Sequence, residues 1–502
     1  MKITPTLLLS YIQCPHRPWR DIFGPQAEKS QENNPFLELL WEKGVQHEKD
    51  IISNFAESFE DMSEGTIEER LAKTKQAMTS KKRFIYQGVI QHENLFAIPD
   101  LLALNEMDLY VPIDIKSGSG LEGADEENGE DGKPKKHYAV QLCLITDIII
   151  KTGFAKERKG FILDGDKNQV EYNLDAPMGA RTPQTYWDFY QEVKSIVGDL
   201  IQDKKRNSPA MSGICKLCSW YESCKSWCKK NDDLTQLFNV GRKVRDTLNN
   251  DLDVSTVKGL LNLNISDLMA QKDGAKGFLS GIGENTLKTA KRRAEILSKN
   301  LPPVLYSKLY IPSVSIEVYL DIEDDSTQSF TYLHGCFVRT KDSTEFKYFV
   351  AKEFSEKAEK EAWTNFWAYI QTLPANDYAV YYYSTHEKTT YRKLQLKFPD
   401  VVSMEEVDSF FSNKNVIDLY QIVSKFTDWP LGSYGIKAIA TYLGFKWRDV
   451  SPSGALSIQW YNDYLKTKSE SILNRILEYN DDDCRATLVL KDKLCEMNKQ
   501  FL

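Results

Sequence analysis

The sequence predicts a multidomain protein of the α/β class. Its 502 residues are enough for about three domains. Stretches with the two-residue alternation of strands recur along the chain, and stretches with helical periodicity separate them. The hydrophobic fraction of 41% and the charged fraction of 27% place the chain among the globular proteins.

The N-terminal part centres on the stretch VPIDIKSG, residues 111–118. Its side chains alternate, so Asp114 and Lys116 fall on one face of a predicted strand. Asp100 follows an apolar stretch, and a hairpin would bring it beside Asp114. Carboxylate oxygens suit the divalent metals that act on phosphodiesters, and Lys116 would position the attacking water or offset charge on the phosphate. Taken alone, an acid–x–lysine triplet also fits a solvated strand face.

Helices and a loop surround this strand in the prediction. His47 lies off the centre of the apolar stripe of its helix, and Gln141 lies on a buried helix. A surface histidine and a structural glutamine are the simpler interpretations, and contact with the metal site is the functional one. The predicted segments are helices at 5–13, 34–55, 65–80 and 137–150, two strands within 83–104, and a mobile loop rich in acids and glycine between 120 and 136.

Cysteines cluster in the stretch CKLCSWYESCKSWC, which contains Cys215, Cys218, Cys224 and Cys228. The first three have the spacing C-x2-C-x5-C, and thiolates this dense in a short loop predict a bound metal. Two sites remain open at this point. One is a local four-thiolate zinc site that uses Cys228, and the other is an iron–sulfur cluster that uses Cys14 as a distant ligand. The contiguous spacing alone favours zinc.

Residues 1–230 resemble the RecB-like branch of the PD-(D/E)XK nucleases, particularly the iron–sulfur members that include CRISPR-associated ones. In that family an early cysteine and a later C-x2-C-x5-C hold a [4Fe–4S] cluster, and Cys14 with Cys215, Cys218 and Cys224 matches this pattern. The resemblance implies a restriction-endonuclease-like mixed sheet with a centre for Mg²⁺ or Mn²⁺. The residues that it implies for this centre are His47 and Asp100 and Asp114 as metal ligands, with Lys116 and Gln141. Where the family usually has a tyrosine four residues after the glutamine, this chain has Ile145.

Residues 231–310 carry two similar pieces, FNVGRKVRDTL and SGIGENTLKTAKRRAEIL, each with a glycine turn before a basic helix. The pair resembles helix–hairpin–helix units, which bind nucleic-acid backbones. A glycine turn exposes backbone N–H groups at a helix N-terminus, and these attract phosphate. The side chains predicted to add salt-dependent attraction are Arg242, Lys243, Arg245, Lys291, Arg292 and Arg293. A plain helical linker with solvated basic faces is the alternative.

Residues 311–502 begin with an alternating strand, SVSIEVYLDIEDD, which puts Asp321 and Glu323 on one face. Two carboxylates held close repel one another unless a metal or protons offset their charge. A late helix carries Tyr479 and Asp483, which lie four residues apart and share a face. This order resembles the ribonuclease H-like DEDD exonucleases of the tyrosine subtype, in which four acids hold two divalent ions.

That second resemblance implies roles for five residues. Asp321, Glu323 and Asp483 would bind Mg²⁺ or Mn²⁺, and Tyr479 would orient the attacking water. The fourth acid would be Glu387, which follows an apolar strand. Asp418 is its replacement candidate, although its place before a predicted helix is typical of a structural acid.

The whole chain is similar to RecB-like nucleases with an attached ribonuclease H-like domain. It has no phosphate-cradling G-x-x-x-x-G-K-[ST] loop, so it is not expected to be an ATP motor. The expected protein is a nuclease with two metal centres that acts on single-stranded DNA or DNA ends in repair, recombination or defence, with a separate helicase as a candidate partner. The alternatives are an RNA-processing exonuclease and a nucleic-acid-binding scaffold with an inactive centre.

Charge and hydropathy add weaker constraints. The net charge of −8 does not suggest a nucleic-acid binder, although local basic patches would suffice for phosphates. No apolar run is long enough to span a membrane, and the N-terminal stretch does not fit a secretory signal. A cytoplasmic protein without a membrane partner is therefore expected.

Overall fold

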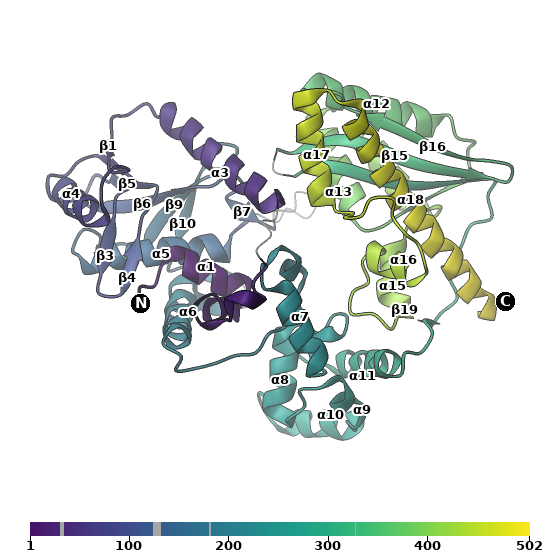
Figure 1. Ribbon diagram of the computed structural model, residues 1–502, viewed down its shortest axis with the longest axis horizontal. Coiled ribbons are helices and arrows are strands. Elements are labelled where there is room, and N and C mark those ends of the chain that lie inside the picture. Colours follow the sequence, from purple (N-terminus) through teal and green to yellow (C-terminus); the bar gives the residue numbers. More distant parts are fainter. Residues whose placement is uncertain (31–34, 124–131, 180–181, 327, 502) are drawn as a thin grey trace. The chain divides into compact units, whose positions relative to one another are not determined.

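The computed structural model describes residues 1–30, 35–123, 132–179, 182–326 and 328–501 (Figure 1). The chain forms two compact units, each of which mixes helices with strands, so the predicted α/β multidomain class is confirmed. The first unit comprises Met1–Asn33, Leu37–Pro209 and Ile214–Ser223, and the second comprises Asn34–Phe36, Ala210–Gly213 and Cys224–Leu502. In the described part of the chain, no helix has the length and apolar character needed to cross a membrane.

A six-stranded mixed sheet organises the first unit. Its order is β1 (Glu60–Asp61), β2 (Phe84–Tyr86), β5 (Leu101–Leu104), β6 (Tyr110–Ile115), β9 (Lys159–Leu163) and β10 (Gln169–Asn173). Strand β6 pairs with β5 on one side and β9 on the other, and it is buried at every residue because both faces of the sheet are covered. The predicted strand is therefore confirmed, but it ends at Ile115, one residue before Lys116.

Six helices cover this sheet, and the periodicity predicted all of them except the second and the last. They are α1 (Pro5–Gln13), α2 (Arg17–Phe23), α3 (Pro35–Ser53), α4 (Ile67–Thr79), α5 (Lys136–Lys151) and α6 (Tyr186–Ile201). A buried core joins α1, α5 and α6 to one sheet face, and Ile51 of α3 packs on Val111, Ile113 and Ile115 of the opposite face. The expectation of two strands within 83–104 is wrong, because the hairpin β3 (Ile90–His92) and β4 (Leu95–Ala97) lies between β2 and β5.

Short strands complete the first unit. They are β7 (Leu121–Glu122), β8 (Lys133–Pro134), β11 (Pro177–Gly179) and β12 (Thr182–Thr185). Most of the predicted acidic loop, residues 124–131, lies outside the described residues.

The second unit begins with a small helical cluster. Its helices are α7 (Tyr221–Lys230, which starts within the first unit), α8 (Arg242–Leu252), α9 (Val257–Leu261), α10 (Ile265–Gly274) and α11 (Glu284–Lys299). The predicted helices α8 and α11 follow Gly241 and Gly283, and α9 and α10 between them were not predicted. These helices enclose a core of their own, so the segment is more than a linker.

A five-stranded mixed sheet follows. Its order is β16 (Thr344–Val350), β15 (Phe330–Thr340), β14 (Ile316–Asp325), β17 (Tyr378–Tyr382) and β18 (Val416–Asp418). Strands β14, β15 and β16 are antiparallel, whereas β17 and β18 run parallel to β14. Before this sheet, β13 (Val304–Leu305) pairs with β19 (Thr427–Asp428).

Helices cover the two faces of this sheet (Figure 1). On one face lie α12 (Glu356–Gln371), α13 (His386–Lys397) and α14 (Met404–Ser412). The opposite face packs against the long helix α18 (Glu470–Asn498), with α15 (Leu419–Phe426), α16 (Ile436–Tyr442) and α17 (Gly454–Thr467) on the same side.

Candidate active site

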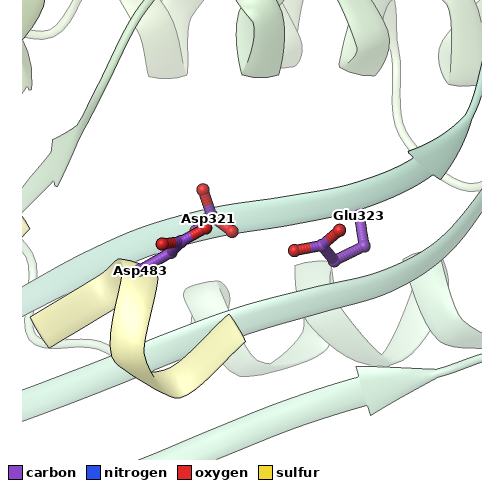
Figure 2. Close-up of side chains that lie close together, drawn as sticks. All are labelled: Asp321, Glu323 and Asp483. Atoms are coloured by element: carbon purple, nitrogen blue, oxygen red, sulfur yellow. The ribbon is translucent and has the colours of Figure 1, made fainter. Parts of the chain in front are cut away.

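Three carboxylates meet between β14 and α18. The alternation of β14 directs Val318 and Leu320 into the core beneath α12, so Asp321 and Glu323 face α18. Helix α18 brings Asp483 to them, and one oxygen from each of the three carboxylates lies within 4.8 Å of the other two (Figure 2). Glu323 and Asp483 are each only 6% exposed. The structure thus brings together three of the acids predicted for the second centre.

The three acids carry strong mutual repulsion. Burial, followed by the charges of Asp483 and Glu323, raises the pKa of Asp321 well above its ordinary value. Burial and Asp483 likewise raise the pKa of Glu323 to about 8. A divalent cation would offset this charge, and hard carboxylate oxygens are the ligands that Mg²⁺ and Mn²⁺ prefer. The three acids therefore fit a divalent ion.

Asn480 fixes the orientation of Asp321 and was not predicted. Its Nδ2 donates to Asp321 Oδ2 at 2.7 Å, and Asn480 itself is fully buried. This approach requires Gly335, which pairs with Asp321 across β14 and β15, because a Cβ there would lie 1.6 Å from Asn480 Oδ1. The sequence signal that could have indicated Asn480 was its position next to the predicted site residue Tyr479.

Tyr479 and Asp483 lie on one face of α18, as predicted. Lys437 of α16 donates to both, with its Nζ 2.8 Å from Tyr479 Oη and 3.0 Å from Asp483 Oδ2. Trp447 Nε1 donates to the other oxygen of Asp483 at 2.7 Å. Burial and the charges of Glu323 and Asp483 raise the pKa of Tyr479, so its hydroxyl keeps its proton. Lys437 and Trp447 were not predicted as site residues.

Glu387 lies near the three acids but does not join their cluster. It sits in the first turn of α13, is 3% exposed, and adds to the raised pKa of Asp321. Burial raises the pKa of Glu387 to about 7, and its Oε2 has no hydrogen-bond partner among the described residues. Asp418 caps α15, where its Oδ1 accepts the N–H groups of Tyr420 and Gln421.

The acids predicted for the first centre lie at the end of β6. Strands β5 and β6 form the predicted hairpin, and Asp100 Oδ2 accepts the N–H of Ile115 at 2.7 Å. Lys116 Nζ lies 2.5 Å from Asp114 Oδ2. Burial and the charge of Asp114 raise the pKa of Asp100 well above its ordinary value. These three residues and Gln141 line an open pocket of about 350 Å³.

Helix α3 brings Glu48 toward this pocket. Gln87 Nε2 donates to Glu48 Oε1 at 2.7 Å and reaches Asp100 Oδ1 at 3.4 Å, and the charge of Glu48 adds to the raised pKa of Asp100. Tyr86 Oη also donates to Glu48 Oε1, at 3.0 Å. The predicted ligand His47 has a buried Nε2 without a hydrogen-bond partner among the described residues. Its neighbour Glu48 was not predicted as a site residue.

Three of the predicted thiols, Cys14, Cys215 and Cys218, lie in the first unit. Burial raises the pKa of Cys218, and the nearby thiols Cys14 and Cys215 add to the rise. The fourth predicted cluster ligand, Cys224, is the first residue of the segment Cys224–Leu502 of the second unit. Cys228, the fourth ligand of the zinc alternative, is fully buried with its Sγ 3.9 Å from Thr235 Oγ1.

Several basic side chains of residues 231–310 bind within the second unit. Arg245 pairs with Asp233 at 3.1 Å, and Arg293 pairs with Asp428 at 2.7 Å. Both arginines are 6% exposed, so they are not solvated basic faces as the alternative supposed. Arg292 also pairs with Asp428, and Lys291 donates to the carbonyl of Leu263. These contacts account for four of the six predicted basic residues, and a nucleic-acid-binding role for the segment stays a prediction.

Comparison with known proteins bears on the second unit. Residues 318–495 match the family model of the RNase_H superfamily. No curated protein and no solved structure matches the chain. The matched range includes β14 and α18, and the mixed sheet is consistent with an RNase H-like fold. RNase H-like enzymes commonly hydrolyse phosphodiester bonds with Mg²⁺ or Mn²⁺. The match supports the RNase H-like part of the expectation, whereas the DEDD subtype and the RecB-like part stay predictions.

Proposed function

We propose that this protein is a metal-dependent DNA nuclease with two hydrolytic centres. The RNase H-like centre would remove nucleotides from the 3′ ends of single-stranded or frayed DNA. The cluster of Asp321, Glu323 and Asp483 carries the proposal, because uncompensated carboxylates held together are costly unless they serve a cation. A place in DNA repair, recombination or defence, and a separate helicase as partner, belong to the same proposal.

The side chains of the RNase H-like centre have different proposed roles. Asp321, Glu323 and Asp483 would hold the divalent ions, with Glu387 as the fourth acid. When bound, such ions polarise the phosphate and lower the pKa of water. Tyr479 keeps its proton and would orient the attacking water through its hydroxyl.

The second proposed hydrolytic site is the first centre, which lies beside β6. Asp100 and Asp114 would bind the ion, and Lys116 would offset charge that develops on the phosphate. The contacts of Glu48 favour it over His47 as a further ligand, because Gln87 links Glu48 to Asp100. Gln141 lines the same pocket and would contact the substrate.

We expect Lys116→Ala to lower the activity of the first centre on the order of 10²–10³-fold, because the variant loses the positive charge that would offset charge on the phosphate. The measurement is degradation of end-labelled single-stranded DNA in Mn²⁺, with Asp321→Asn as background to silence the other centre. Lys156→Ala, at an exposed lysine of the same unit, is the control. Equal activity of both lysine variants would remove the first centre from the proposal.

The cluster proposal assigns [4Fe–4S] to Cys14, Cys215, Cys218 and Cys224. We expect anaerobically purified protein to contain iron and sulfide, because Cys14 and Cys215 lie near Cys218. Cys14→Ser should lose the iron, and Cys228→Ser should keep it. A colourless protein with stoichiometric zinc that depends on Cys228 would establish the zinc alternative instead.

The test of the whole proposal compares DNA with RNA. End-labelled single strands of each, with free 3′ or blocked 3′ ends, would be incubated with the protein in Mg²⁺ and Mn²⁺. Loss of mononucleotides from free DNA 3′ ends supports the proposal. Preferential degradation of RNA would support an RNA-processing exonuclease, and intact substrates would support a scaffold.

A further inference from the structure

Lys437 contacts the acidic cluster without being one of its acids. Its Nζ lies 2.8 Å from Tyr479 Oη and 3.0 Å from Asp483 Oδ2, and 4.9 Å from the centre of the Tyr479 ring. Trp447, which follows α16, donates to the remaining oxygen of Asp483. The segment from α16 to Trp447 therefore holds Asp483 at both of its oxygens.

The position of Lys437 is not explained by the stability of α16. Lys437 lies in the first turn of that helix, directly after Ile436. A cation at a helix N-terminus opposes the helix dipole, which favours acids there. The ammonium group is instead directed at α18, where its charge also lowers the pKa values of Asp321 and Glu323 against the effect of burial.

The hydrogen bond from Lys437 determines whether the Tyr479 hydroxyl donates or accepts toward its other neighbours. An ammonium group has only donors, so Lys437 donates to the oxygen of Tyr479. The Tyr479 proton is then available for a hydrogen bond to a water molecule or a substrate oxygen. Without Lys437, the hydroxyl could accept or donate in several directions.

We infer that Lys437 is a positioning residue of the RNase H-like centre, which holds Tyr479 and Asp483 in one arrangement and makes the Tyr479 hydroxyl a hydrogen-bond donor. This inference rests on the proposed nuclease function. It also implies a competition, because the ammonium group and a bound cation share the charge of Asp483. Removal of Lys437 should therefore strengthen metal binding and weaken catalysis.

The test uses Lys437→Met in full-length protein, with Asp114→Asn as background so that the first centre binds no metal. We expect Mn²⁺ to bind at least about threefold more tightly by calorimetry. For a single-stranded DNA 3′ end, kcat should fall about 10- to 100-fold with little change in KM. Lys437→Arg should return the Mn²⁺ affinity to that of the background protein but recover only part of kcat. A guanidinium group keeps the charge but not the geometry of the ammonium group. Lys446→Met, at an exposed lysine between α16 and Trp447, should match the background.

A double variant tests the link to Tyr479. If Lys437 acts through this hydroxyl, Lys437→Met should cause no further loss of kcat in a Tyr479→Phe protein. Independent, multiplicative losses would overturn the inference, as would unchanged kcat and Mn²⁺ affinity in Lys437→Met. If the wild type is inactive on every substrate, the proposed function fails, and the Mn²⁺ affinities alone decide whether the ammonium group competes with the ion. Lys437→Gln replaces Lys437→Met if the latter unfolds, as judged by thermal denaturation.

Discussion

Asp321→Asn is expected to abolish removal of nucleotides from DNA 3′ ends, with a loss of kcat on the order of 10³-fold. Asp321 shares the cluster with Glu323 and Asp483, and its Oδ2 is already oriented by Asn480. The substitution keeps the shape of the side chain but removes the charge that the other two acids need to hold a cation. The measurement is release of labelled 3′ mononucleotides at saturating Mn²⁺.

The melting temperature and the stabilisation by Mn²⁺ show whether Asp321→Asn loses activity through its metal site or through unfolding. Because burial and repulsion raise the pKa of Asp321, its neutralisation should not destabilise the metal-free protein. We therefore expect Asp321→Asn to melt at or above the wild-type temperature in a chelator, and to lose the stabilisation that Mn²⁺ gives the wild type. Asp342→Asn, at an exposed acid of the turn between β15 and β16, should behave as wild type. Full exonuclease activity in Asp321→Asn would disprove the assignment of this centre.

The centre on β14 was predictable because two local sequence patterns indicate its residues. The alternation of β14 separates apolar from acidic residues, and Tyr479 and Asp483 are one helical turn apart. Lys437 was not predictable in the same way. It meets Asp483 from a separate helix, 46 residues away in the chain, and no periodicity of α16 indicates that approach.

The choice between His47 and Glu48 shows the same limit. Neighbouring residues on a helix point in directions that differ by about 100°, so the periodicity of α3 cannot say which one reaches Asp100. The link runs through Gln87, whose backbone is left-handed with a φ of 52°. Such a conformation at a residue other than glycine has no clear signal in the sequence.

The basic residues of α11 were misleading because composition does not reveal pairing. Arg292 and Arg293 were expected to meet phosphate, yet both pair with Asp428, which lies 135 residues after Arg293. Arg293 is buried, donates to the carbonyl of Phe238, and lies 4.9 Å from the centre of its ring. This cluster joins the helical segment to β19 of the RNase H-like part within the second unit.

Asp428→Ala is accordingly expected to destabilise the second unit by about 3–5 kcal/mol. Asp428 is fully buried, and its removal leaves the buried charge of Arg293 without a partner. The measurement is the free energy of unfolding in urea, together with hydrogen exchange along α11, which should open before the sheet. Glu295→Ala is the matched control, since it breaks an exposed ion pair with Lys299 on the same helix and should have a far smaller effect.

A second variant shows whether the cost comes from the unpaired charge. Combining Asp428→Ala with Arg293→Met should recover much of the lost stability, because no buried cation then remains unpaired and Arg292 can turn to solvent. Loss of stability equal to that of Glu295→Ala would mean that Asp428 does not anchor the helices. If salt-dependent DNA binding survives in the double variant, the phosphate contacts of this segment come from other residues, such as the exposed Lys243.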